Sequence, residues 1–122
     1  MTSDTDTTLG ELKERIAAFT TARDWEQFHA PKNLAMALAT EVGELMEHFL
    51  WIDAEESRRL CNDPAKRDEV ADELADVLIY ALRLADVVGL DPAKTVMAKL
   101  ARNEERYPVE KAKGSSAKYD EL

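Results

Sequence analysis

Apolar residues recur every three or four positions along most of this 122-residue chain, which is the period of an amphipathic α-helix. A first helix is predicted to start after Thr8, which forms a capping-box pair with Glu11. Its inner face is expected to hold Leu12, Ile16 and Phe19, spaced four and three residues apart. No stretch alternates between apolar and polar residues in the way of a half-buried strand. The pattern therefore predicts an all-α protein.

Proline and capping residues mark three more main helices. Pro31 suits the first turn of the second helix, and Asp63-Pro64 and Asp91-Pro92 each combine an N-cap with a proline at the first helical position. The second helix has an apolar stripe formed by Leu34, Leu38, Val42, Leu45 and Phe49. The stripe of the third helix is formed by Val70, Leu74, Val77 and Ala81.

Short polar segments set the remaining boundaries. Asp53 and Glu56 cap a short helix that is expected to run through Leu60, and Gly89 is the expected end of the third main helix. The domain is thus predicted to be a helical bundle of four main helices plus a short one. The chain divides into a flexible N-terminus, this domain and a mobile charged tail, at residues 1–7, 8–108 and 109–122.

Two acidic pairs at helical spacing border the apolar stripes. Glu41 and Glu44 lie beside the stripe of the second helix, and Glu73 and Asp76 beside that of the third. Residues three apart share a helix face, so two such helices packed together bring four carboxylates to one place. Like charges that close repel strongly unless cations lie among them. Hard oxygen ligands favour Mg²⁺, with Mn²⁺ as a substitute, and Mg²⁺ commonly binds together with a phosphate substrate.

Several side chains support two interpretations, and the residues alone leave both open. The acids suit a solvated surface as well as a metal site, and His48 and Glu69 lie on the same borders. Trp25 and His29 either cover the end of a bundle or line a pocket for a flat ring, with Trp51 as a further wall. The fourth helix carries either a solvated basic face or a phosphate clamp. The residues of that face are Lys99, Arg102, Asn103 and Arg106.

Charge and composition exclude some classes of protein. A formal net charge of -9 argues against binding a nucleic-acid polymer through counterion release, whereas a free nucleotide can bind together with metal ions. The single cysteine, Cys61, permits no intramolecular disulfide. Charges at residues 13–15 interrupt the first apolar run, so no signal peptide or membrane span is expected. We therefore expect a cytoplasmic protein. Two histidines are too few for a di-iron centre of the helical-bundle kind.

The apolar arc of the third main helix is wider than one small bundle needs. Beyond its stripe, further apolar residues spread round the helix, namely Ala71, Ala75, Leu78, Ile79 and Leu82. An apolar arc of this width requires a second partner surface. We therefore expect a homo-oligomer interface on this helix.

Seven strings together resemble one family. They are RDWEQFH at 23–29, PKNL at 31–34, EVGEL at 41–45, FLW at 49–51, DELADVLIY at 72–80, KLARN at 99–103 and RYP at 106–108. From about Leu9 to Pro108 the chain resembles the MazG-like, all-α nucleoside triphosphate pyrophosphohydrolases. Within that family it is most similar to the dCTP pyrophosphatase branch.

The resemblance implies a Mg²⁺-dependent enzyme that cuts between the α- and β-phosphates of dCTP or modified dCTP, releasing a nucleoside monophosphate and pyrophosphate. It also implies a homodimer or a homotetramer, with four-helix cores completed across subunits. The implied catalytic metal ligands are Glu41, Glu44, Glu73 and Asp76. The implied nucleoside pocket comprises Trp25, His29, Trp51 and Tyr80. The implied phosphate contacts are Lys99, Asn103, Arg106 and Tyr107.

Two alternatives to this function stand beside it. One is the same reaction on another nucleotide, such as dUTP or a damaged purine nucleotide. The other is a non-catalytic helical interaction module whose acids only solubilise it. The first changes the base that is recognised, and the second removes the metal site altogether.

Overall fold

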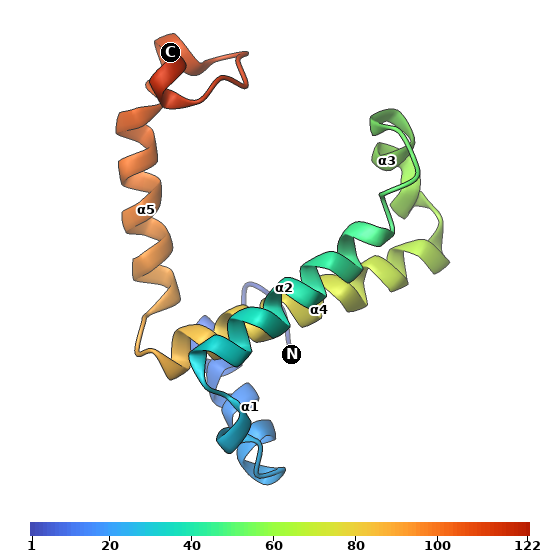
Figure 1. The fold of residues 1–122 in the computed structure, drawn as a ribbon, viewed down its shortest axis with the longest axis vertical. Helices are drawn as coiled ribbons and strands as arrows, with labels where there is room; N and C mark the ends of the chain where they lie inside the picture. Colours follow the sequence, from blue (N-terminus) through green and yellow to red (C-terminus); the bar gives the residue numbers. More distant parts are fainter. The chain divides into compact units, whose positions relative to one another are not determined.

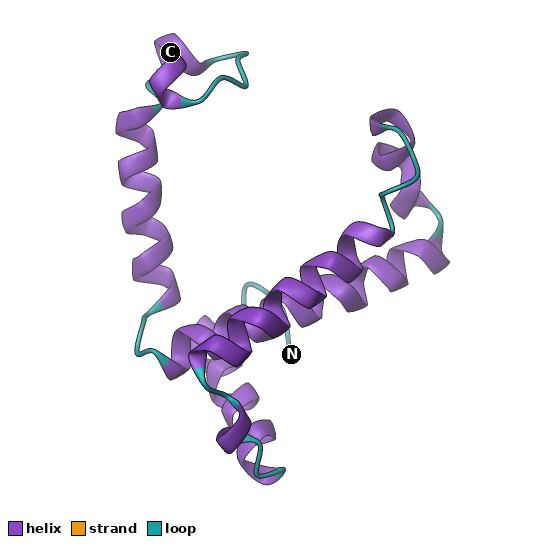
Figure 2. Ribbon diagram, viewed as in Figure 1, coloured by secondary structure: helices purple, strands orange, loops and turns teal.

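The computed structural model describes residues 1–122 and contains helices but no strand (Figure 2). The prediction of an all-α protein is therefore confirmed. The chain forms two compact units, residues 1–89 and 90–122. None of the helices is long and apolar enough to cross a membrane.

An antiparallel pair of long helices, α2 (Pro31–Glu47) and α4 (Pro64–Val87), is the centre of the first unit (Figure 1). The two helices lie side by side along most of their length. They are joined by α3 (Ala54–Arg59) and a turn of 3₁₀-helix, η2 (Leu60–Asn62). The first helix, α1 (Leu9–Ala22), packs against α4. A second 3₁₀ turn, η1 (Glu26–Phe28), connects α1 to α2.

The predicted helix starts are confirmed by their hydrogen bonds. Thr8 and Glu11 form both bonds of the capping box. Asp53 and Asp63 accept from backbone N–H groups at the starts of α3 and α4. Each bond satisfies a donor that the first turn of a helix leaves free. Gly89 follows the end of α4 with a φ of 75°, the left-handed conformation expected of a glycine at that place.

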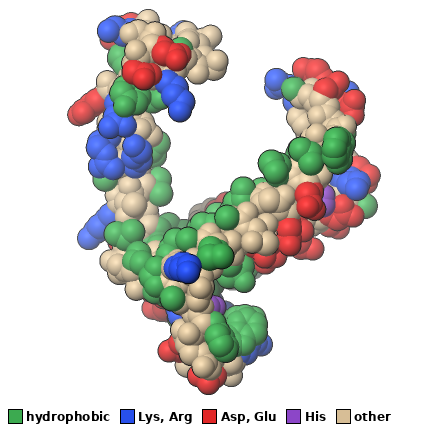
Figure 3. All heavy atoms as spheres, in the orientation of Figure 1, with side chains coloured by type: hydrophobic (Ala, Val, Ile, Leu, Met, Phe, Trp, Pro, Cys, Tyr) green, Lys and Arg blue, Asp and Glu red, His purple; other side chains and the backbone are tan.

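The first unit buries few side chains fully. Leu34 and Thr20 are the only buried residues, at 1% and 2% exposure. Val42 and Leu74, which the stripes assigned to a core, are 46% and 45% exposed, so for a single chain that assignment is wrong. The reason is that α2 covers only one side of α4, whereas the apolar arcs continue past the contact. Hydrophobic side chains consequently remain on the surface along this pair (Figure 3).

The predicted inner face of α1 is also more open than expected. Leu12 and Phe19 are both exposed. Part of the Phe19 ring is covered by its neighbours in sequence. The Arg23 guanidinium lies 3.7 Å from the ring centroid, and Trp25 packs edge-on at 5.6 Å. Phe19 is therefore shielded locally rather than by a second layer of helices.

The second unit contains α5 (Pro92–Arg106), α6 (Val109–Ala112) and a 3₁₀ turn, η3 (Tyr119–Glu121). Asp91 caps α5 as predicted, by accepting from the N–H of Lys94. The segment 109–122, expected to be a mobile tail, has helical turns in the structure. Tyr119 of this segment packs edge-on against Tyr107, with ring centroids 6.2 Å apart. The tail's mobility stays a prediction.

Candidate active site

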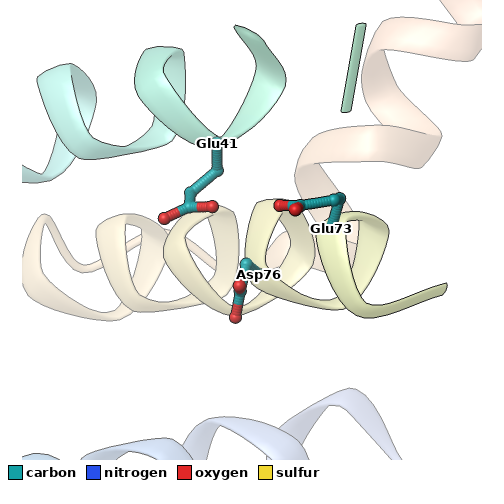
Figure 4. A group of neighbouring side chains, drawn as sticks. All are labelled: Glu41, Glu73 and Asp76. Carbon is teal, nitrogen blue, oxygen red and sulfur yellow. The ribbon is translucent and has the colours of Figure 1, made fainter. Parts of the chain in front are cut away.

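Carboxylates from two helices, α2 and α4, lie close to one another. Glu41 projects from α2 toward α4, and Glu73 and Asp76 come from successive turns of α4 (Figure 4). One oxygen atom from each side chain lies within 4.8 Å of those from the other two. The antiparallel pairing of α2 and α4 places the two acidic pairs at the same level. The structure thus brings together three of the four acids that the spacing singled out.

One oxygen atom of this group is buried without a partner. Oε2 of Glu41 is sealed from solvent and makes no hydrogen bond. Burial raises the pKa of the Glu41 carboxyl, and the adjacent carboxylates of Glu44, Asp76 and Glu73 raise it further. A buried and unpaired carboxylate is costly, and a cation among the oxygens would offset that cost. Three clustered carboxylates therefore fit a hard divalent cation such as Mg²⁺.

Glu44 lies at the edge of this group rather than in it. After burial, Glu44 is the next cause that raises the pKa of both Glu41 and Glu73, through a hydrogen bond to their protonated forms and through its charge. Its carboxylate is therefore next to both side chains. As the side chains stand, its oxygens do not join the cluster of three.

His48 connects the acidic group to a further carboxylate, that of Glu69. Its Nε2 lies 4.0 Å from Oε1 of Glu73, and its Nδ1 lies 3.7 Å from Oε2 of Glu69. The same Glu69 oxygen is 3.3 Å from Nζ of Lys66. The half-buried imidazole at the end of α2 thus spans two acids of α4. The sequence predicted only that His48 borders the apolar stripe of α2. Its contacts with Glu69 and Glu73 depend on how α2 and α4 pack.

A small cavity lies beside α4, between α1 and the connector that follows it. Trp25, His29 and Tyr80, all predicted to line a nucleoside pocket, are among its walls. The other walls are Ile16, Phe19, Thr20, Ile79 and Arg83. Its volume of about 70 Å³ is well below the roughly 300 Å³ at which ligand pockets begin. As it stands, the cavity can receive only part of a nucleoside.

The other predicted contacts are not part of this cavity. Trp51, in the turn after α2, is 90% exposed and is not a wall of the cavity. The predicted phosphate contacts lie on α5 or directly after it, in the second unit, and they are Lys99, Asn103, Arg106 and Tyr107. The Arg106 guanidinium lies 4.8 Å from the Tyr119 ring centroid. The approach of these residues to the acids stays a prediction.

Arg83 was missed by the sequence reasoning. Its side chain is only 11% exposed, and its Nε donates to Nδ1 of His29 over 3.1 Å. Its Nη1 lies 3.5 Å from Oδ2 of Asp86. Burial lowers the pKa of His29, the Arg83 charge lowers it further, and Glu26 opposes them. The sequence did contain a signal for Arg83, which is the one charged residue in the apolar run Ala81–Ala85. An arginine on such a face is seldom buried without partners, so a partner could have been sought.

Comparisons with known proteins agree with this fold. The model of the MazG-like family matches residues 36–122. The chain is 43% identical over 115 residues to dCTP pyrophosphatase 1 of Bos taurus and 44% identical to that of Homo sapiens. Each alignment covers 94% of this chain and 68% of the relative. A crystal structure of a pyrophosphatase from Archaeoglobus fulgidus superposes with a TM-score of 0.78 at 36% identity, covering 88% of this chain and 99% of that one.

The helical fold and the similarity to dCTP pyrophosphatases over most of the chain define an enzyme of the nucleotide-hydrolysing, all-α class. The chain belongs to the MazG-like family. The expected resemblance is thereby confirmed. Membership in this family and the similarity to dCTP pyrophosphatases support nucleoside triphosphate pyrophosphohydrolase activity.

Proposed function

We propose that this chain is a Mg²⁺-dependent hydrolase of dCTP or of modified deoxycytidine triphosphates. The reaction consumes one water molecule and breaks the bond between the α-phosphorus and its bridging oxygen to the β-phosphorus. The products are the nucleoside monophosphate and pyrophosphate. The observation that carries the proposal is the carboxylate cluster of α2 and α4 with its unpartnered Glu41 oxygen. Similarity to dCTP pyrophosphatases over most of the chain supports the choice of substrate.

Each group of residues has a distinct role in this proposal. Glu41, Glu73 and Asp76 hold the cation, and Glu44 completes the set from the edge of the group. A divalent cation held there supplies neutralising charge for the polyphosphate and lowers the pKa of a water molecule. The cavity walls and Trp51 take the base, and polar and basic residues after Asp91 take the phosphates. We assign the base to Trp25, His29, Trp51 and Tyr80, and the phosphates to Lys99, Asn103, Arg106 and Tyr107.

The direct test is to incubate the purified protein with each deoxynucleoside triphosphate in Mg²⁺ or in chelator and to separate the products by chromatography. We expect dCTP to yield dCMP and pyrophosphate only when Mg²⁺ is present. Hydrolysis of a different base would keep the chemistry and overturn the substrate. Failure to cleave or bind any nucleotide, modified deoxycytidine triphosphates included, would overturn the function and favour an interaction module.

Replacing His48 by leucine is expected to raise the Mg²⁺ concentration needed for half-maximal activity roughly tenfold. The imidazole that spans Glu69 and Glu73 restricts the carboxylate of Glu73, and leucine would release it. The measurement is a Mg²⁺ titration of initial rates. Lys66→Gln is the matched control, because Lys66 contacts Glu69 but not the cluster. An unchanged Mg²⁺ requirement in the leucine variant would show that His48 does not act on Glu73.

Replacing Trp51 by alanine is expected to weaken nucleotide binding about tenfold, the typical loss for one base-stacking aromatic side chain. Thermal stability should be nearly unchanged, because the side chain is 90% exposed. Calorimetric titration with an uncleavable dCTP analogue measures the first quantity, and thermal denaturation the second. Leu50→Ala is the neighbouring control. Equal affinity in the Trp51 variant would remove this residue from the pocket.

We also propose that two copies, or two pairs of copies, complete a four-helix core around α2 and α4. The exposed apolar side chains of these helices support such pairing, because they form an arc that one chain leaves uncovered. Leu78 is 54% exposed within this arc. A single chain with one fully buried apolar residue also has an unusually small core.

Sedimentation is expected to give a mass of at least two chains for the natural sequence. Replacing Leu78 by glutamate should shift the mass toward one chain, because a charge would be buried at the interface. Val109→Glu, at a residue that is also exposed but lies in the tail segment, is the control and should leave the mass unchanged. A natural sequence that sediments as one chain at micromolar concentration would contradict the pairing.

A further inference from the structure

One hydrogen bond in the cavity determines which atom of His29 faces a ligand. His29 is the C-cap of η1, and its backbone N–H bonds the carbonyl of Glu26 over 3.1 Å. Asn33 of α2 donates to the carbonyl of Phe28 over 3.2 Å. These two bonds hold the connector on both sides of His29, and Arg83 joins the imidazole ring to α4.

The bond from Arg83 fixes the position of the imidazole proton. Its Nε always carries hydrogen, and it donates to Nδ1 of His29 over 3.1 Å. Nδ1 must therefore keep its lone pair, and the single ring proton of the neutral imidazole lies on Nε2. Arg83 is itself held in place, because its side chain is nearly buried and Asp86 lies one turn away at 3.5 Å. Protonating Nδ1 would break this bond and place two cations side by side.

The second ring nitrogen remains available to a ligand. Nε2 of His29 makes no hydrogen bond within the chain and is not among the atoms sealed from solvent. Tyr80 stands one turn before Arg83 on α4, and both line the cavity together with His29. His29 thus brings a free N–H donor to the wall of a cavity that also has aromatic walls, and this combination suits the edge of a flat ring.

We propose that Arg83 is a positioning residue that holds His29 as a hydrogen-bond donor toward the base of the substrate. This inference rests on the proposed function. At this place the site recognises an acceptor on the base, a carbonyl oxygen or an unprotonated ring nitrogen. Cytosine presents O2 and N3 as adjacent acceptors, whereas uracil carries hydrogen on N3. A donor fixed in this way distinguishes cytosine from uracil where it meets N3, because both bases offer a carbonyl oxygen.

The first test measures the tautomer of His29 by ¹⁵N NMR of the free protein. The chain has two histidines, so the signals of His29 are assigned by their persistence in a His48→Gln variant. In the natural sequence we expect Nδ1 to resonate as an unprotonated nitrogen and Nε2 as a protonated one. Arg83→Met should populate the other tautomer. Arg67→Met, the same substitution at an exposed arginine of α4, should not change the spectrum. A protonated Nδ1 in the natural sequence overturns the proposal whether or not any variant folds.

The second test measures recognition of the base. Affinity for an uncleavable dCTP analogue should fall about five- to tenfold in Arg83→Met, the loss typical of one hydrogen bond. Affinity for the corresponding dUTP analogue should fall less, and Arg67→Met should bind both analogues as the natural sequence does. Equal binding by Arg83→Met and the natural sequence overturns the positioning role even where hydrolysis is observed. Absence of hydrolysis in the natural sequence counts against the proposed function, and the NMR result stands independently of it.

Discussion

Replacing Glu41 by glutamine is expected to lower kcat for triphosphate hydrolysis by at least about a hundredfold, the loss typical of removing one charge-stabilising group from an active site. The substitution keeps the size of the side chain and removes the negative charge that a cation needs. Stability of the metal-free protein should stay the same or increase, because the buried carboxylate of Glu41 has no partner for one of its oxygens. Loss of activity without loss of stability separates a ligand from a structural residue.

Initial rates and thermal denaturation in chelator test both parts of this prediction. Glu14→Gln is the control. Glu14 is an exposed acid on α1, so this substitution removes the same charge at a place outside the cluster. Full activity in the Glu41 variant would refute the metal assignment. Loss of both activity and folding would instead show that the carboxylate contributes to structure, contrary to its unpartnered state.

Without a divalent cation, the protein is expected to lose stability as pH rises from about 4.5 toward neutrality. The pKa values of Glu41 and Glu73 are both raised above their ordinary value of 4.5, first by burial and then by Glu44. The folded state therefore binds these protons more tightly than the unfolded state. The stability that this provides is fully present below 4.5 and is lost as pH rises through the raised pKa values.

Mg²⁺ should reverse this loss. At a concentration about 100 times its dissociation constant, a ligand of the folded state alone adds about 2.7 kcal/mol to the free energy of unfolding. Urea denaturation at several pH values, in chelator and in Mg²⁺, measures the difference. We expect the gap, the difference in free energy of unfolding between Mg²⁺ and chelator, to widen as pH rises. The gap should be narrower in the Glu41→Gln variant. A gap that shrinks as pH rises would mean that the cation does not bind these carboxylates.

The helices and their ends were predictable from the sequence because they depend on local interactions. Thr8 with Glu11, Asp63 before Pro64, and Gly89 after α4 act on backbone groups within one turn, so their hydrogen bonds follow from residue type and spacing. The grouping of Glu41 with the acids of α4 could also be predicted, because acids three residues apart lie on one helix face.

The detailed site was less predictable because it depends on packing. Whether Glu44 joins the cluster depends on its rotamer and on the separation of α2 and α4, which a helical wheel does not contain. The bond between Arg83 and His29 joins residues 54 positions apart. Burial was overestimated at Val42 and Leu74, because a periodic stripe shows that a face is apolar and not what covers it.

The small interior of the single chain has a practical consequence for enzymology. With Leu34 as its one fully buried apolar side chain, each chain depends on its partner for most of its core if the proposed pairing holds. Folding is then a bimolecular equilibrium, and the midpoint of unfolding moves with protein concentration. Dilution to the nanomolar range used in rate assays would release single chains that lose their structure. Specific activity should therefore fall on dilution, and substrate or Mg²⁺ added beforehand should protect it.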